Sequence, residues 1–298
     1  EPYLLPKLRY AEKNAGKRIE YPAKPIKPCR PLCIRNILHA NCLPPILTNT
    51  GSSRVKPNTI CTIRYYPTAA RTLSFLSSQP LNGEMLMQPY RFYFVGPMRV
   101  YSELVTRSTR LHMMGVRFSP CGLAAFARMP LGEFTDTRVN ASELNVLFDD
   151  HFAEMLCEKE SLQERIHIID RHLIARLPGL QPVDPQIIRA TDLIVRANGM
   201  LPIQQLTDKL YIGQRHFERK FKHITGYTPK EFSRITKFRY ATRVLRQMKG
   251  EDMQQLAIDC GYYDPSHFIK EFRKLSGSNP SAFMALPIPE DDPLTYIE

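Results

Sequence analysis

The chain has 298 residues, of which 43% are hydrophobic and 23% charged, so it can form a folded core and is long enough for two domains. Its formal net charge of +12 favours a polyanionic partner, which charge alone leaves open as DNA, RNA or an anionic membrane surface. It has no apolar run of about 18 residues, no signal-peptide core at its start, and seven irregularly spaced cysteines, so we expect a cytoplasmic protein without a membrane span.

The first 60 residues are rich in proline and carry 11 basic against 3 acidic groups. Pro22, Pro25, Pro28 and Pro31 follow one another at intervals of three, which favours extended or polyproline II backbone. We predict an arm or irregular lead-in over residues 1–60.

One cluster in this lead-in has residue types that bind metals, namely Cys29, Cys33, His39 and Cys42. Four such ligands could close a tetrahedral zinc site, but structural zinc sites ordinarily use tighter paired spacings. Reduced cysteines more often serve as small hydrophobic residues. We therefore expect no metal or cofactor, and keep a metal- or redox-sensing protein, with Cys61 as a further thiol, as an alternative.

Residues 61–180 are predicted to form a β-rich sensor or dimerisation domain with C-terminal helices, in a small β-barrel or sandwich. Four β-prone runs are separated by Pro, Gly and Asn, at residues 59–66, 73–76, 90–95 and 111–118. Between residues 147 and 177, apolar residues recur every three to four positions, which predicts a long amphipathic helix. This helix forms either a dimer interface or a layer packed on its own domain. Prolines and a glycine in 178–185 mark the domain boundary.

Residues 184–283 contain an internal repeat, carry 17 basic against 10 acidic groups, and precede an acidic tail at 284–298. The members His-Phe, Phe, Gly, Pro and Phe recur 51 residues apart, starting at His216 and at His267. Gln204-Gln-Leu recurs as Gln254-Gln-Leu, at an offset of 50. One residue is therefore inserted between the matching halves, in the turn. The chain is predicted to be α+β, with an all-α double helix-turn-helix domain at its C-terminus.

Each copy is predicted to have a short helix, a turn and a second helix, over 203–210 and 213–224 in the first copy and over 253–260 and 265–275 in the second. Asp264-Pro265 is a strong helix start, and Asp184-Pro185 and Asn279-Pro280 repeat it. A capping box, Thr228 to Glu231, opens the connecting helix.

The polar faces of the two second helices supply the candidate DNA contacts. Because Phe217 and Phe221, like Phe268 and Phe272, are spaced to point inward, the polar residues on the other faces of each helix point outward. Arg and Lys contact guanine edges, and Ser and His add hydrogen bonds. The candidate base contacts are Arg215, Glu218, Arg219, Ser266, His267 and Lys270. The candidate phosphate contacts are Lys222, Lys230, Lys237, Arg243, Arg273 and Lys274.

Residues 184–283 resemble the AraC-type (AraC/XylS) DNA-binding domain, in which a long helix links two helix-turn-helix subdomains. The second copy carries the most specific match, from Gly261 to Arg273 (GYYDPSHFIKEFR) and then GSNPSAF from Gly277. The first copy departs from the pattern, because Tyr211 and Gly213 stand where the family commonly has Gly and then Ser. The first recognition helix therefore lacks its usual hydroxyl cap.

The β-rich region resembles the sensor domain that precedes a subset of these regulators, through the run FVGP from Phe94 and the run from Gly115 to Phe126. This resemblance implies effector binding or dimerisation and names no effector. His112, Arg117 and Cys121 are candidates to line an effector pocket, although such residues on a strand are more often structural.

The sequence has no nucleophile elbow, phosphate loop or H-E-x-x-H motif, so we predict no enzyme and no catalytic residue. The expected function is sequence-specific transcription regulation in response to an effector. Two recognition helices would occupy successive major-groove segments of double-stranded DNA. Further candidate partners are RNA polymerase, a small-molecule effector and a second copy of the chain. We expect no binding to a membrane. An RNA-binding protein is an alternative.

Overall fold

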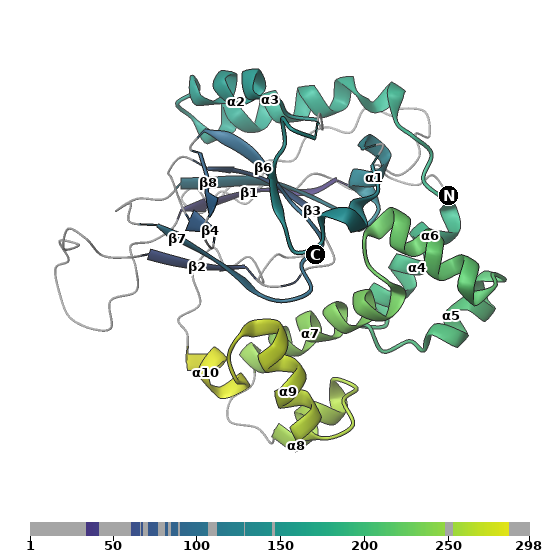
Figure 1. The fold of residues 1–298 in the computed structure, drawn as a ribbon. Coiled ribbons are helices and arrows are strands. Elements are labelled where there is room, and N and C mark those ends of the chain that lie inside the picture. Colours follow the sequence, from purple (N-terminus) through teal and green to yellow (C-terminus); the bar gives the residue numbers. More distant parts are fainter. Residues whose placement is uncertain are drawn as a thin grey trace, which may run out of the picture.

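The computed structural model describes residues 34–41, 61–65, 67, 71–76, 81–82, 85–88, 90–106, 112–127, 129–144, 147–247 and 253–285. Strands occupy the N-terminal part and helices the C-terminal part, so an α+β chain with a helical C-terminal domain is confirmed (Figure 1). Within these residues, no helix is long and apolar enough to cross a membrane. The acidic residues 286–298 lie outside the described residues, as do Cys29, Cys33 and Cys42.

The N-terminal strands form two antiparallel sheets. The larger has the order β1-β8-β3-β6-β9 and the smaller the order β2-β7-β4-β5. The strands are β1 (Ile34–Asn41), β2 (Cys61–Tyr65), β3 (Arg71–Leu76), β4 (Leu81–Asn82), β5 (Met85–Leu86), β6 (Arg91–Val95), β7 (Ser102–Thr106), β8 (His112–Phe118) and β9 (Arg138–Asn140). The four predicted runs correspond to β2, β3, β6 and β8.

The prediction that residues 1–60 form only an arm or lead-in is wrong for residues 34–41. This segment is strand β1, which pairs with β8 from Ile34 opposite Phe118 to Asn41 opposite His112, with a register shift between Ile34 and Ile37. A strand is possible here because the prolines stop at Pro31 and resume only at Pro44, so the intervening backbone keeps its amide donors.

The predicted long helix over 147–177 is two helices, α2 (Asp150–Cys157) and α3 (Leu162–Ala175). The break has a local cause, because Ser161 and Glu164 form a capping box that starts a new helix. Figure 1 shows both helices across one face of the larger sheet. Their buried side chains, among them Phe152 and Leu173, join β6 and β8 in one hydrophobic core. Packing of this region on its own domain is therefore confirmed, while the dimer interface stays a prediction.

Two further short helices, α1 (Gly122–Phe126) and the 3-10 helix η1 (Leu131–Phe134), lie between β8 and β9. The 3-10 helix η2 (Leu177–Gly179) follows α3 and leads into the C-terminal domain.

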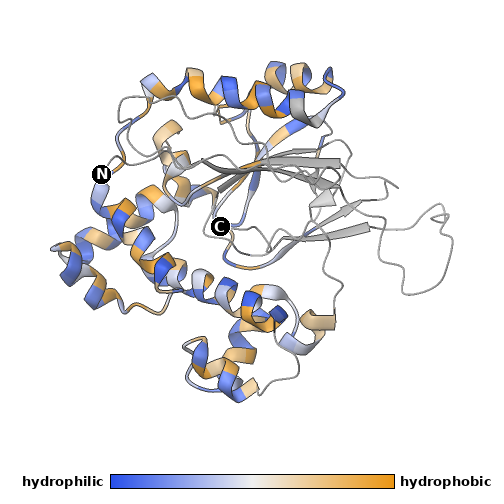
Figure 2. Ribbon diagram, turned by 180° about the vertical axis from the view of Figure 1, so that it is seen from behind, coloured by the Kyte–Doolittle hydropathy of each residue, from blue (hydrophilic) through white to orange (hydrophobic). Residues whose placement is uncertain are grey.

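The C-terminal domain has seven helices in the described residues, and all seven lie where the sequence predicts a helix or a helix start. They are α4 (Pro185–Arg196), α5 (Ile203–Leu210), α6 (Gln214–Thr225), α7 (Pro229–Gln247), α8 (Met253–Asp259), α9 (Pro265–Ser276) and α10 (Pro280–Ala285). Hydrophobic and hydrophilic residues alternate along these helices (Figure 2), as amphipathic helices require.

Helix α7 joins two separate hydrophobic cores. Its first half places Phe232 and Ile235 in a core with α4, α5 and α6. Its second half places Phe238 and Leu245 in a core with α8, α9 and α10. The two helix-turn-helix units therefore pack independently and share one helix.

Candidate nucleic-acid interface

In the first unit, α5 ends on Tyr211, which has left-handed backbone with φ of 52° and ψ of 48°. This conformation costs an L-residue about 1–2 kcal/mol, because its Cβ crowds the next carbonyl. Two residues later Gly213 begins α6 without a side-chain cap, as predicted from the sequence.

In the second unit, both of these positions have residues suited to their backbone. Gly261 occupies the left-handed position with φ of 71°. Asp264 caps α9, since its Oδ1 accepts a hydrogen bond of 2.7 Å from the amide of His267. Tyr211 matches Gly261 at an offset of 50, whereas Gly213 matches Asp264 at an offset of 51. The predicted insertion in the turn is confirmed.

The C-terminal ends of the two recognition helices are built alike. Gly226 ends α6 and Gly277 ends α9, both with φ of 73°. The hydroxyl of Thr225 donates to the carbonyl of Phe221 at 2.8 Å, and Ser276 makes the same bond to Phe272. The two recognition helices therefore end in the same way at their C-termini and differ in the turn and cap at their N-termini.

The outward faces of α6 and α9 are solvent-exposed. The inward pairs Phe217 and Phe221, and Phe268 and Phe272, are fully buried. All six candidate base contacts are exposed, namely Arg215, Glu218, Arg219, Ser266, His267 and Lys270. The structure therefore leaves this set free to enter a groove.

Local contacts orient part of the first face. The side-chain amide of Gln214 donates to the carboxylate of Glu218 at 2.9 Å, and the guanidinium of Arg219 lies 3.3 Å from Nδ1 of His216. His223 is also exposed and matches Lys274 at an offset of 51. Sequence reasoning missed it, although the repeat offset would have found it.

The candidate phosphate contacts differ in solvent exposure. Lys222, Lys230, Arg243, Arg273 and Lys274 are exposed. Lys237 is instead half-buried on α7, where its ammonium donates to the carbonyl of Gly261 at 2.9 Å and lies 5.4 Å from the ring centre of Tyr262. Burial lowers the pKa of Lys237. Lys237 thus anchors the turn of the second unit to α7.

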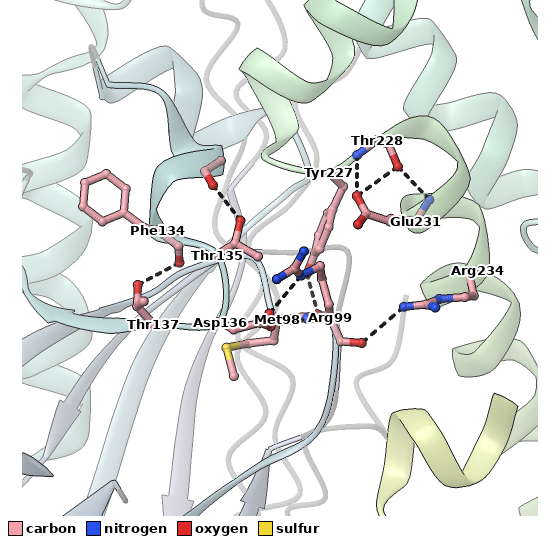
Figure 3. Close-up of polar contacts among 11 residues, drawn as sticks. Met98, Arg99, Phe134, Thr135, Asp136, Thr137, Tyr227, Thr228, Glu231 and Arg234 are labelled. Carbon is pink, nitrogen blue, oxygen red and sulfur yellow. Dashed lines mark hydrogen bonds and ion pairs between the residues drawn. The ribbon is translucent and has the colours of Figure 1, made fainter. Parts of the chain in front are cut away.

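The N-terminal domain docks on the C-terminal ends of both recognition helices, away from their N-terminal ends. The hydroxyl of the buried Tyr227 donates to the carbonyl of Met98 at 2.9 Å (Figure 3). A Cβ at position 226 would lie 2.4 Å from Pro97, and a Cβ at position 277 would lie 2.4 Å from the ring of Tyr101. Glycine is therefore required at both helix ends by backbone conformation and by close contact.

Two hydrogen-bonded loops carry these contacts. Asp136, in left-handed backbone with φ of 58°, accepts hydrogen bonds from the amide and the guanidinium of Arg99 at 2.6 and 2.9 Å. The carbonyl of Arg99 in turn accepts a bond of 3.4 Å from Arg234 on α7 (Figure 3). The sequence does not indicate Tyr227 or Asp136, because their partners lie 129 and 37 residues away and such contacts leave no local pattern.

A cavity of about 350 Å³ lies in the N-terminal domain, beside the segment that leads into α4. Phe126, Phe148, Asp149 and Arg176 are among its lining residues. Cys121 lies elsewhere, buried with its Sγ 3.7 Å from the hydroxyl of Thr191 on α4.

The side chains of His112, Arg117 and His39 lie outside the described part of the structure. Within that part, no group of three or more His, Cys, Asp or Glu could hold a metal.

Two family models match the chain. Residues 206–285 match a family described as a helix-turn-helix domain, and residues 62–140 match a domain of unknown function. No curated protein matches. The C-terminal part of the chain is a helix-turn-helix domain of the AraC type.

Solved structures of regulators are similar to this chain. ToxT from Vibrio cholerae is 8% identical over 76% of this chain and 97% of its own, with a TM-score of 0.46. The DNA-binding domain of AdpA, in complex with a target DNA, is 22% identical over 34% of this chain and 92% of its own, with a TM-score of 0.32. A probable AraC family transcriptional regulator from Rhodopseudomonas palustris is 25% identical over 34% of this chain and 95% of its own, with a TM-score of 0.31. Because each TM-score is below 0.5, we base the assignment on the family model and the repeated units.

Proposed function

We propose that the chain is a sequence-specific, effector-responsive transcription regulator that inserts α6 and α9 into successive major-groove segments of double-stranded DNA. The observation that carries this proposal is the pair of matched recognition helices, each with its aromatic pair buried and its basic face exposed. The major groove admits an α-helix, and Arg and Lys contact guanine there.

The two outward faces match position by position. At an offset of 51, Arg215 corresponds to Ser266, Arg219 to Lys270, and Lys222 to Arg273. Each helix thus offers cations along one stripe, and Arg219 and Lys270 lie at its centre. We assign base contacts to this centre, and phosphate contacts to Lys222, Lys230, Arg243, Arg273 and Lys274 around it.

The N-terminal domain supplies the effector response in this proposal. The cavity beside residues 179–184 has the size of a small-molecule site, and Asp149 and Arg176 give it charged groups of both signs. An effector there would act on the segment leading into α4, which begins at Gly179 and Leu180 in the cavity wall. Ser142→Phe, which fills part of the cavity, is expected to abolish effector dependence in a reporter assay while DNA binding persists.

The DNA proposal is tested by selecting bound fragments from random duplex DNA and then measuring affinity for the selected sequence. Arg219→Ala is expected to weaken specific binding by about 1–3 kcal/mol and to relax preference at one base pair. Lys274→Ala is expected to weaken all sequences alike and to reduce the salt dependence.

Arg171→Ala is the matched control, since Arg171 is an exposed cation on α3 of the other domain. It is expected to bind like the wild type. Unchanged specific binding by Arg219→Ala would show that α6 does not enter the groove. Preferential competition by RNA would favour the RNA-binding alternative.

A further inference from the structure

Two tyrosine side chains project from the turns that precede the recognition helices. Tyr211, in the turn before α6, is 95% exposed, and Tyr263, in the turn before α9, is 90% exposed. These are the most exposed large hydrophobic side chains among the described residues, the next being Ile174 at 56%. Neither ring gains burial energy in the free protein, so folding alone does not account for them.

The backbone of Tyr211 adds a second, independent observation. This residue has left-handed backbone, a conformation in which the second unit uses Gly261. The turn is closed by the amide of Ile212, which donates to the carbonyl of Thr207 at 3.2 Å, and the exposed ring of Tyr211 does not help to hold it. Left-handed backbone at a residue other than glycine is common at functional sites. A glycine would meet the needs of the fold at position 211, so the exposed ring has no role in folding.

The position of the two turns indicates what they contact. In a helix-turn-helix unit the first helix crosses the DNA backbone, and the N-terminal residues of the second contact base edges. The turn between them therefore lies beside the sugar-phosphate wall of the groove. Tyr211 precedes Arg215 by four residues, and Tyr263 precedes Ser266 by three.

We propose that Tyr211 and Tyr263 contact the DNA backbone at the edge of the major groove, one beside each recognition helix. The hydroxyl donates to a phosphate oxygen, and the ring packs on the adjacent sugar. Such contacts position the helix without specifying sequence. The two turns reach this arrangement differently, because Tyr263 is the inserted residue of the second turn whereas Tyr211 stands at the left-handed position. This inference rests on the proposed function.

The experiment measures thermal stability and affinity of the full chain for a random-sequence duplex of about 30 base pairs. Tyr211→Gly is expected to raise Tm, because it releases backbone strain, and yet to weaken binding by about fivefold to tenfold. Tyr211→Asn, which also tolerates left-handed backbone, is expected to show the same loss and separates loss of the ring from added flexibility. Tyr263→Ser is expected to lose as much affinity with Tm unchanged, and Tyr263→Phe to lose less.

Tyr90→Gly is the matched control, since Tyr90 is also exposed and left-handed, with φ of 58°, but lies in the N-terminal domain. It is expected to raise Tm without changing affinity. If Arg219→Ala weakens binding to the selected sequence while the Tyr211 and Tyr263 variants bind both duplexes like the wild type, the inference is wrong and the proposed function stands. A wild-type chain that does not bind duplex DNA overturns both. Loss of affinity in only one turn overturns the inference for the other.

Discussion

The two helix-turn-helix units share one design but differ in what holds them. In the first unit, Tyr227 follows the C-terminal end of α6 and contacts the N-terminal domain. The N-cap position of α6 is Gly213, which makes no side-chain cap hydrogen bond. The second unit has Ser278 in place of Tyr227, and the side chain of Asp264 caps the start of α9. The first unit thus has a hydrogen bond to the N-terminal domain and no side-chain cap on α6. The second unit meets that domain through the close approach of Tyr101 to Gly277 and has its own cap on α9.

The separate cores give the largest expected effect. Phe272 is fully buried in the core of α8, α9 and α10, and its removal is expected to cost about 3–5 kcal/mol. Because α4, α5 and α6 have their own core, Phe272→Ala is expected to abolish amide-exchange protection in α8–α10 and to leave the first unit protected. Phe221→Ala is the matched variant and is expected to show the reverse pattern. Equal loss of protection in both units would contradict independent packing.

The contact between domains comes next in size. Tyr227→Phe removes the donor to the buried carbonyl of Met98 and is expected to destabilise the first unit by about 1–3 kcal/mol, measured by urea denaturation. Ser278→Ala at the matched position of the second unit is expected to have a smaller effect, since no contact between the domains is lost. Equal effects at the two positions would mean that Tyr227 does not distinguish the units.

Substitutions at the two helix N-caps are expected to change stability by less, and in opposite directions in the two units. Asp264→Ala removes the bond to the amide of His267 and is expected to cost about 1 kcal/mol, seen as a lower Tm. Gly213→Asp supplies the missing cap to α6 and is expected to stabilise by a few tenths of a kcal/mol. A stabilisation of similar size from Asp264→Ala would refute the role assigned to this cap.

Interactions between residues close in the sequence could be predicted, whereas interactions between distant residues could not. The turn insertion, the caps at Asp264 and Thr228, and the inward aromatic pairs all depend on residues within a few positions, and the structure confirms them. Strand β1 and the docking of Tyr227 depend on partners far along the chain, so no local spacing indicates them. The exposed faces of α6 and α9 were predictable because burial of one face fixes the other.

The smallest expected effect concerns an ion pair that only the first unit has. The ammonium of Lys220 on α6 lies 2.6 Å from Asp184, the cap of α4. The second unit has Glu271 at the position of Lys220, and this carboxylate lies 3.8 Å from Arg234 on α7 instead. Burial acts to raise the pKa of Asp184, but hydrogen bonds from Lys220 and the amide of Gln186 outweigh it, so the pKa is below its usual value.

A carboxylate with a lowered pKa in the folded state stabilises the fold above its unfolded pKa of about 3.9, and this stabilisation is lost as pH falls through the lower folded value. Asp184→Asn keeps a good helix cap and removes the charge. It is expected to cost about 0.5 kcal/mol at pH 7, as for a partly exposed pair, and progressively less as the pH falls below the unfolded pKa. Denaturation of both proteins across pH 2 to 7 measures this difference. A constant difference at every pH would mean that the ion pair contributes nothing and that Asp184 acts through its cap alone.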